Sequence, residues 1–93
     1  MDYDYQEEQL VEVAEEIDST KKKNLVVFND DFNTFDHVIN TLIKICDHSP
    51  EQAEQCTFII HYKGKCSVKN GSYLELKPMK EGITDAGIGA SIF

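Results

Sequence analysis

The feature that most constrains the fold is a short apolar run that ends abruptly in polar residues. Residues 25–28 read Leu-Val-Val-Phe, and residues 29–31 read Asn-Asp-Asp. An unbroken run of this length, rich in β-branched and aromatic side chains, is typical of a strand covered on both faces. The amide and two carboxylates that follow form an acceptor-rich corner suited to a cation or an ammonium group. An ordinary strand-ending turn has the same composition, so the corner alone does not assign a function.

The charges divide the chain into two parts. The formal net charge is -8, from 17 acidic and 9 basic residues among 93. Eight of the acidic residues fall within positions 1–20, and positions 21–93 are formally neutral. We therefore predict a disordered acidic tail over residues 1–23, with a helical spacing at 10, 13, 14 and 17 that allows a short helix against a partner. Residues 24–93 are predicted to form one small domain.

Composition excludes several classes of function. Every basic residue is lysine, so the planar fork that arginine offers to phosphates and guanines is missing, and nucleic acid is not an expected partner. No apolar stretch has the length of a membrane span, so no membrane association is expected. Three widely spaced cysteines fit reduced thiols in a cytoplasmic protein. No cofactor is expected, and a metal site at Cys46, Asp47 and His48 is a minor alternative because a second ligand pair is missing.

Two helices are predicted after the acidic corner. Asn33 or Thr34 can cap the first, whose apolar residues at 35, 38, 39, 42, 43 and 46 recur at helical spacing until the helix ends near Asp47. The second begins at Ser49-Pro50-Glu51-Gln52, which matches a capping box with proline at the first helical position. It carries an apolar stripe at 53, 56, 57 and 60 and closes at Gly64. The two helices are expected to form a tight hairpin.

The last third of the chain is predicted to add a strand, a helix and a strand. Residues 65–69 alternate weakly and lead into Asn70-Gly71, a dipeptide that favours a turn. Residues 72–75, Ser-Tyr-Leu-Glu, match another capping box, but Pro78 predicts a helix that breaks and restarts before reaching Asp85. Gly87 ends this helix, and residues 88–93 are predicted to form the final strand.

Two of these segments resemble the ClpS family of protease adaptors. Residues 29–32, Asn-Asp-Asp-Phe, match the family's turn before an apolar helix, and residues 61–65, His-Tyr-Lys-Gly-Lys, match its His-x-x-Gly-Lys segment about thirty residues on. The resemblance implies an α+β domain with a three-stranded antiparallel sheet packed against three helices, in the order βααβαβ. It also implies binding without catalysis.

The implied ligand is a protein whose first residue is large and hydrophobic, an N-degron. The implied partner is an AAA+ unfoldase of the ClpA or ClpC type, joined to the Clp peptidase, and the adaptor is expected to be a monomer. The family's contacts to the N-terminal amine carry over to Asn29, Asp30, Asp31, Asn33 and His61. Its hydrophobic pocket carries over to Phe35, Val38, Thr57, Ile60 and Ile88.

One departure from the family pattern concerns the entrance to that pocket. The family has Thr-Pro-Met after the aromatic residue, and this chain has Asn33-Thr34-Phe35. Phenylalanine is stiffer and bulkier than the methionine that it replaces, so the resemblance leaves open which first residues are accepted.

Two other functions are compatible with the residues. Asp30, Asp31 and His61 are residue types that serve acid-base or metal-assisted hydrolysis, although the chain has no nucleophile-base motif and no third metal ligand. The small α+β fold is also similar to the C-terminal domain of the ribosomal stalk protein, an interaction module for translation factors. That role would leave the acidic corner unused.

Overall fold

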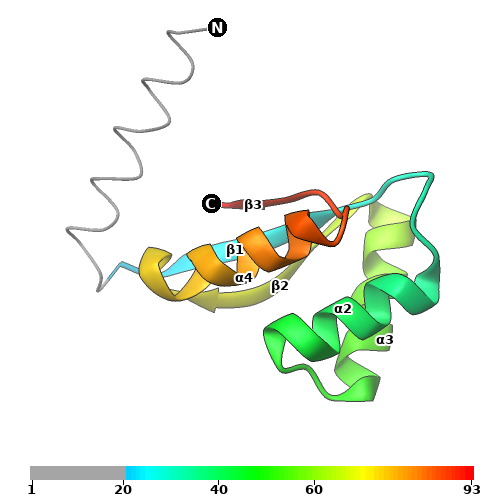
Figure 1. Ribbon diagram of the computed structural model, residues 1–93, viewed down its shortest axis with the longest axis horizontal. Coiled ribbons are helices and arrows are strands. Elements are labelled where there is room, and N and C mark those ends of the chain that lie inside the picture. The colour runs from blue at the N-terminus through cyan, green and yellow to red at the C-terminus, as the bar shows by residue number, and fades with distance from the viewer. Residues whose placement is uncertain (1–20) are drawn as a thin grey trace, which may run out of the picture.

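The computed structural model describes residues 21–93. Its elements follow the predicted order βααβαβ (Figure 1), with the strands β1 (Lys23–Phe28), β2 (Lys65–Gly71) and β3 (Ala90–Ile92) and the helices α2 (Phe35–Cys46), α3 (Pro50–Lys63) and α4 (Tyr73–Asp85). The predicted tail falls mostly on residues 1–20, which lie outside the described part of the chain. Within residues 21–93, no helix has both the length and the apolar character needed to cross a membrane.

The strands form one antiparallel sheet in the order β2-β1-β3, which confirms the predicted α+β class. Leu25 pairs with Lys69 on one side and Ile92 on the other. The β1–β2 register shifts between Leu25 and Val26, where β2 accommodates an extra residue. β1 is therefore the central strand, and its carboxyl end delivers residues 29–31 to one edge of the domain.

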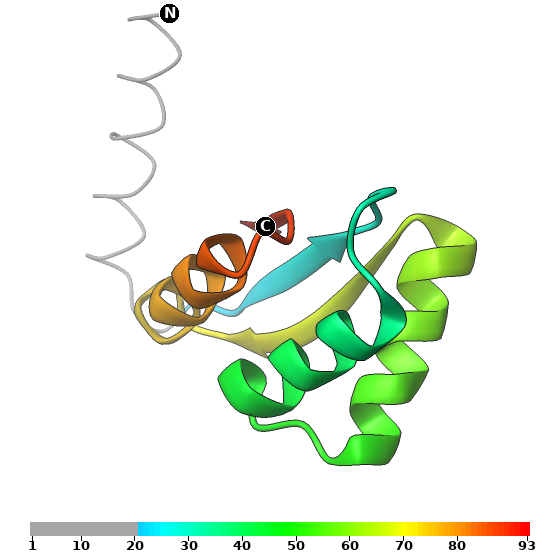
Figure 2. The ribbon, with the colours of Figure 1, turned by 45° about the vertical axis from the view of Figure 1, so that its right-hand side comes forward.

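The helices cover one face of this sheet (Figure 2). Leu25 and Val27 are fully buried, whereas Val26 and Phe28 are only half-buried. The buried core joins alternate residues of the strands with residues from α2, α3 and α4. Within residues 21–93 the prediction that β1 is covered on both faces is therefore wrong, because the alternation along an antiparallel strand places every second side chain on the face away from the helices.

Side chains cap all three helices at the predicted positions. The hydroxyls of Thr34 and Ser49 accept hydrogen bonds of 3.1 Å from the backbone N–H groups three residues on. Ser72 and Glu75 form the reciprocal capping box that was predicted. Gly64 closes α3 with a φ of 90°, a left-handed conformation that glycine adopts without steric cost.

Two predictions, one for α4 and one for residues 70–71 before it, are wrong. α4 runs without a break through Pro78, which lies on the exposed side of the helix, while Leu76 and Ile83 anchor the opposite side in the core. Water can satisfy the carbonyl that the proline leaves unpaired there. Residues 70–71 also form no turn, because β2 continues to Gly71 and leads straight into the capping box. A Cβ at Gly71 would lie 2.8 Å from Oε1 of Glu75, so glycine makes room for that box.

The final strand is shorter than predicted. β3 covers only residues 90–92, and the segment before it turns through Gly87, which has a φ of 86°. Ile88 sits in that turn with its N–H bonded to the carbonyl of Ile83 at 3.2 Å. The strand is then fixed to β1 by reciprocal backbone bonds of 2.8 Å between Phe93 and Asn24.

Candidate functional site

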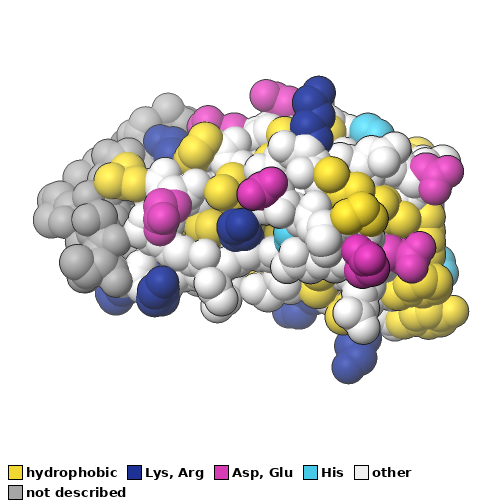
Figure 3. Space-filling model, turned by 90° about the horizontal axis from the view of Figure 1, so that it is seen from below, with side chains coloured by type: hydrophobic (Ala, Val, Ile, Leu, Met, Phe, Trp, Pro, Cys, Tyr) yellow, Lys and Arg dark blue, Asp and Glu magenta, His cyan; other side chains and the backbone are white. Residues whose placement is uncertain are grey.

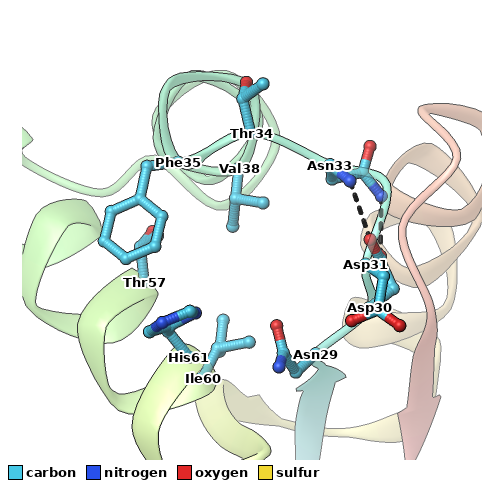
Figure 4. A pocket seen from close by; sticks show the side chains of 10 residues that line it. All are labelled: Asn29, Asp30, Asp31, Asn33, Thr34, Phe35, Val38, Thr57, Ile60 and His61. Atoms are coloured by element: carbon cyan, nitrogen blue, oxygen red, sulfur yellow. Dashed lines mark hydrogen bonds between the residues drawn. The ribbon is translucent and has the colours of Figure 1, made fainter.

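A pocket of about 320 Å³ opens where the end of β1 and the loop after it meet the start of α2 and the last two turns of α3. Figure 4 shows side chains from these segments arranged around it. Its lining comprises Asn29, Asp30, Asp31, Asn33, Thr34, Phe35, Val38, Thr57, Ile60 and His61. The polar side chains of residues 29–33 lie at one end, and the apolar side chains from the two helices lie at the other.

The structure brings together every site residue predicted from the sequence except Ile88. Ile88 is not among the lining residues; it follows the turn at Gly87 and is buried in the core, with 3% of its side chain exposed. Thr34 lines the pocket although it was predicted only as a helix cap. Its hydroxyl is occupied by the backbone N–H of His37, and the sequence offered no further signal for it.

A backbone hydrogen bond next to the β1–β2 pairing of Phe28 with Lys65 joins the two segments that carry the polar residues. The backbone N–H of Asn29 donates to the carbonyl of Gly64 at 2.8 Å. This bond fixes the end of β1 against the end of α3, where His61 lies in the last helical turn. The side chains of Asn29 and His61 therefore face the same pocket from separate parts of the chain (Figure 4).

Asp30 organises the loop between β1 and α2. Its Oδ1 accepts the backbone N–H groups of Phe32 and Asn33, both at 2.8 Å, and its Oδ2 accepts the Asn33 side-chain amide at 2.7 Å. That amide also donates to the carbonyl of Gly87 at 2.9 Å, which ties the loop to the turn before β3. The hydrogen bonds from Asn33 and Phe32 hold the pKa of the Asp30 carboxyl below its usual value.

Asp31, the next residue along the chain, differs from Asp30 in its hydrogen bonding. Within residues 21–93 its carboxylate makes no hydrogen bond or ion pair, and the same holds for the side-chain amide of Asn29. Both side chains are exposed at the polar end of the pocket. The carboxylate of Asp31 and the amide oxygen of Asn29 are therefore open acceptors, whereas the acceptors of Asp30 are already used within the loop.

The apolar end of the pocket is built from buried residues of both helices. Val38 of α2 and Thr57 and Ile60 of α3 are buried and line its floor and wall. The Thr57 hydroxyl donates to the carbonyl of Ala53 at 2.8 Å, so its polar group is satisfied within the helix. The wall can accordingly receive an apolar side chain without leaving a buried donor unpaired.

Phe35, the first residue of α2, closes one side of the pocket. Its ring meets the ring of Phe58 edge-on at 5.4 Å and that of His61 at 5.1 Å. These are favourable aromatic geometries, and both partner rings come from α3. The position at which the family pattern has a methionine is thus occupied by a ring held between two others.

The metal alternative at residues 46–48 does not match the structure. Cys46 and His48 are buried, and Nε2 of His48 is paired with the carbonyl of Val68 at 2.7 Å. Burial raises the pKa of the Cys46 thiol to about 11, which disfavours the thiolate that a metal requires. Across residues 21–93, no group of three or more His, Cys, Asp or Glu side chains is arranged to hold a metal ion.

The fold and the pocket define a small α+β domain with a pocket that is polar at one end and apolar at the other. In the comparison with known families, residues 18–88 match the model of the ATP-dependent Clp protease adaptor protein ClpS. This chain belongs to the ClpS family. The match covers most of the chain and both motifs, so it confirms the family resemblance read from the sequence. It does not support a relation to the ribosomal stalk domain.

Named relatives agree with this assignment. The ATP-dependent Clp protease adapter protein ClpS of Thermosynechococcus vestitus is 35% identical over 65 residues, which are 69% of each chain. That of Treponema denticola is 34% identical over 56 residues, 60% of this chain and 55% of its own length. That of Salmonella gallinarum is 33% identical over 74 residues, 75% of this chain and 70% of its own length.

A solved structure shares the fold. The structure of Agrobacterium tumefaciens ClpS2 bound to L-phenylalaninamide superposes with a TM-score of 0.67 and covers 80% of this chain and 96% of that chain. The two sequences are only 13% identical, so this likeness concerns the arrangement of helices and strands.

Proposed function

We propose that this chain binds the free N-terminus of proteins whose first residue is large and hydrophobic, and delivers them to a Clp unfoldase for degradation. One observation carries the proposal: open acceptors from two separate segments, Asn29, Asp31 and His61, share a pocket with a buried apolar wall. An α-ammonium group offers three donors, and the first side chain of the same residue offers an apolar group beside it.

The chemistry of this pocket suits such a ligand in both parts. Hydrogen bonds to charged groups contribute roughly 1.5–3 kcal/mol each, and burial of a leucine or phenylalanine side chain contributes roughly 1.5–3 kcal/mol. Three such bonds and one buried side chain sum to roughly 6–12 kcal/mol before the cost of association is subtracted, a range that includes the ~8 kcal/mol of a micromolar complex. The ligand of the structural relative, L-phenylalaninamide, has the same two parts, an amine and an apolar side chain.

His61 supplies the acceptor from the second segment. An imidazole ring nitrogen that carries no proton can accept a hydrogen bond from an ammonium group. His61→Gln keeps an acceptor at this position, whereas His61→Ala removes it. A peptide that begins with Leu should therefore bind His61→Gln more tightly than His61→Ala.

The test is fluorescence anisotropy with peptides that differ only in their first residue. Peptides that begin with Phe, Leu, Tyr or Trp should bind with micromolar affinity, and peptides that begin with Ser should not. Acetylation removes the charge and two of the three donors, so an acetylated Leu peptide should bind at least about tenfold more weakly. Equal binding of the free and acetylated peptides would refute the proposal.

Delivery is tested separately from binding. A stable reporter protein that begins with leucine should be degraded faster by an AAA+ unfoldase of the ClpA or ClpC type with its peptidase when this chain is added. The matched reporter that begins with serine should not respond. Acceleration of both reporters, or of neither, would contradict the proposed adaptor role.

A further inference from the structure

The aromatic side chains around Phe35 form a closed ring of contacts. Phe35 meets Phe58 at 5.4 Å and His61 at 5.1 Å, Phe58 stacks on Tyr62 at 6.2 Å, and Tyr62 meets His61 at 5.3 Å. Phe58 and His61 are three residues apart and so share one face of α3. We call these four residues the aromatic ring network. Each member is held by two others, which leaves the Phe35 ring little freedom to tilt.

This network lies at the surface and is not part of the core. Phe58 is 45% exposed, and Tyr62 is more exposed still. Figure 3 shows hydrophobic side chains gathered at the end of the molecule where α2 and α3 lie, beside acidic ones. The buried core contains no member of the network, so its contacts are not needed to close the core.

Phe58 differs from its neighbours in its relation to the pocket. Phe35 and His61 line the pocket, whereas Phe58 does not and instead contacts the ring of Phe35. A movement of Phe35 toward Phe58 would therefore displace the Phe58 ring. Val38 and Ile60, which line the pocket between Phe35 and the polar end (Figure 4), are packed in the core, so a displacement of these side chains is costly.

We propose that Phe58 is a positioning residue that sets the largest first side chain the pocket accepts, by holding Phe35 in place. This inference rests on the proposed function. A smaller residue at position 58 would leave a space into which Phe35 can turn. The pocket would then widen and favour a bulky indole over a leucine side chain, while the open acceptors for the amine stay where they are.

The experiment compares the full-length wild type with Phe58→Ala in anisotropy titrations with two peptides, one beginning with Leu and one with Trp. The quantity compared is the dissociation constant of the Trp-first peptide divided by that of the Leu-first peptide. This ratio should be about fivefold lower in Phe58→Ala than in the wild type. Phe58→Leu, which retains apolar bulk without the ring, should shift the ratio in the same direction by less. Ile59→Ala serves as the matched control, since Ile59 is the next residue of α3, is 37% exposed and has no ring.

The outcomes separate this inference from the function on which it rests. Thermal unfolding monitored by circular dichroism verifies that each variant is folded. An unchanged ratio in Phe58→Ala and Phe58→Leu, or an equal weakening of both peptides, would overturn the role of Phe58 and leave the proposed function standing. A ratio that shifts as much in Ile59→Ala would also overturn it. A wild type that binds neither peptide would overturn the proposed function itself.

Discussion

Replacing Asp30 by alanine should destabilise the domain, although the residue lies at the surface. The substitution removes three hydrogen bonds of 2.7–2.8 Å that shape the loop between β1 and α2. A single net hydrogen bond contributes roughly 0.5–1.5 kcal/mol, and exposure to solvent keeps these bonds at the lower part of that range. We therefore expect a loss of about 2 kcal/mol in the free energy of unfolding, or about 10 °C in Tm for a domain of this size.

The pH dependence of this effect follows from the lowered pKa of the Asp30 carboxyl. A carboxyl with a depressed pKa in the folded state stabilises fully above its unfolded value of 3.8, and this stabilisation is lost as the pH falls through the folded value. The difference in Tm between wild type and Asp30→Ala should thus be constant at neutral pH and shrink as the pH drops below about 4.

Asp31→Ala is the matched control for that measurement. Asp31 is adjacent and exposed, and among residues 21–93 it has no hydrogen-bond partner, so its removal should change the free energy of unfolding by less than about 0.5 kcal/mol. Thermal unfolding by circular dichroism from pH 7 to pH 2.5 measures both variants. Equal Tm values for the two variants at pH 7, or a difference from wild type that does not shrink as the pH falls below about 4, would refute the reasoning.

Three further expectations follow from the structure. Asp31→Asn should fold normally yet bind a Leu-first peptide about tenfold or more weakly in anisotropy titrations, because it loses a charge-assisted bond to the amine; unchanged affinity would remove Asp31 from the site. Burial raises the pKa values of the Cys46 and Cys56 thiols to about 11 and about 12, so neither thiol should be alkylated by iodoacetamide at pH 8 while the protein is folded. Peptide mass mapping measures the labelling, and rapid labelling of the folded protein would contradict this expectation. His48→Ala should lower the free energy of unfolding, measured in urea, by about 2–3 kcal/mol, because it removes the hydrogen bond to Val68 and leaves a cavity at the buried imidazole site. A change below about 0.5 kcal/mol would show that the site relaxes freely.

The parts of the fold that depend on local chemistry were predictable from the sequence. Thr34, Ser49 and Ser72 begin helices because their hydroxyls bond backbone N–H groups three residues on, a rule that needs no tertiary context. Gly64 ends α3 because a left-handed residue is required there. These signals gave the order of the elements correctly.

Features that depend on tertiary context were not predictable in this way. Pro78 is tolerated in α4 because it lies on the exposed side, and Ile88 turns into the core because Gly87 redirects the chain before β3. From the sequence, Asp30 and Asp31 have the same chemistry. Only the path of the loop shows that Asp30 accepts the hydrogen bonds that shape it, whereas the Asp31 carboxylate faces the pocket as an open acceptor.

The convergence of the polar residues on one pocket was implied only by the family resemblance. It depends on the β1–β2 pairing and on the backbone bond between Asn29 and Gly64, which joins positions 35 residues apart and has no local signature. Phe58 was missed because an exposed aromatic residue on the outer side of a helical stripe has the pattern of an ordinary surface position.

The most direct test of the central claim is an NMR measurement of where the first residue of a bound peptide lies. With a peptide carrying an isotope-labelled N-terminal leucine, nuclear Overhauser effects should connect that side chain to the methyl groups of Val38, Thr57 and Ile60. Effects to α4 or to the face of the sheet opposite the helices, with none to these three residues, would contradict the account.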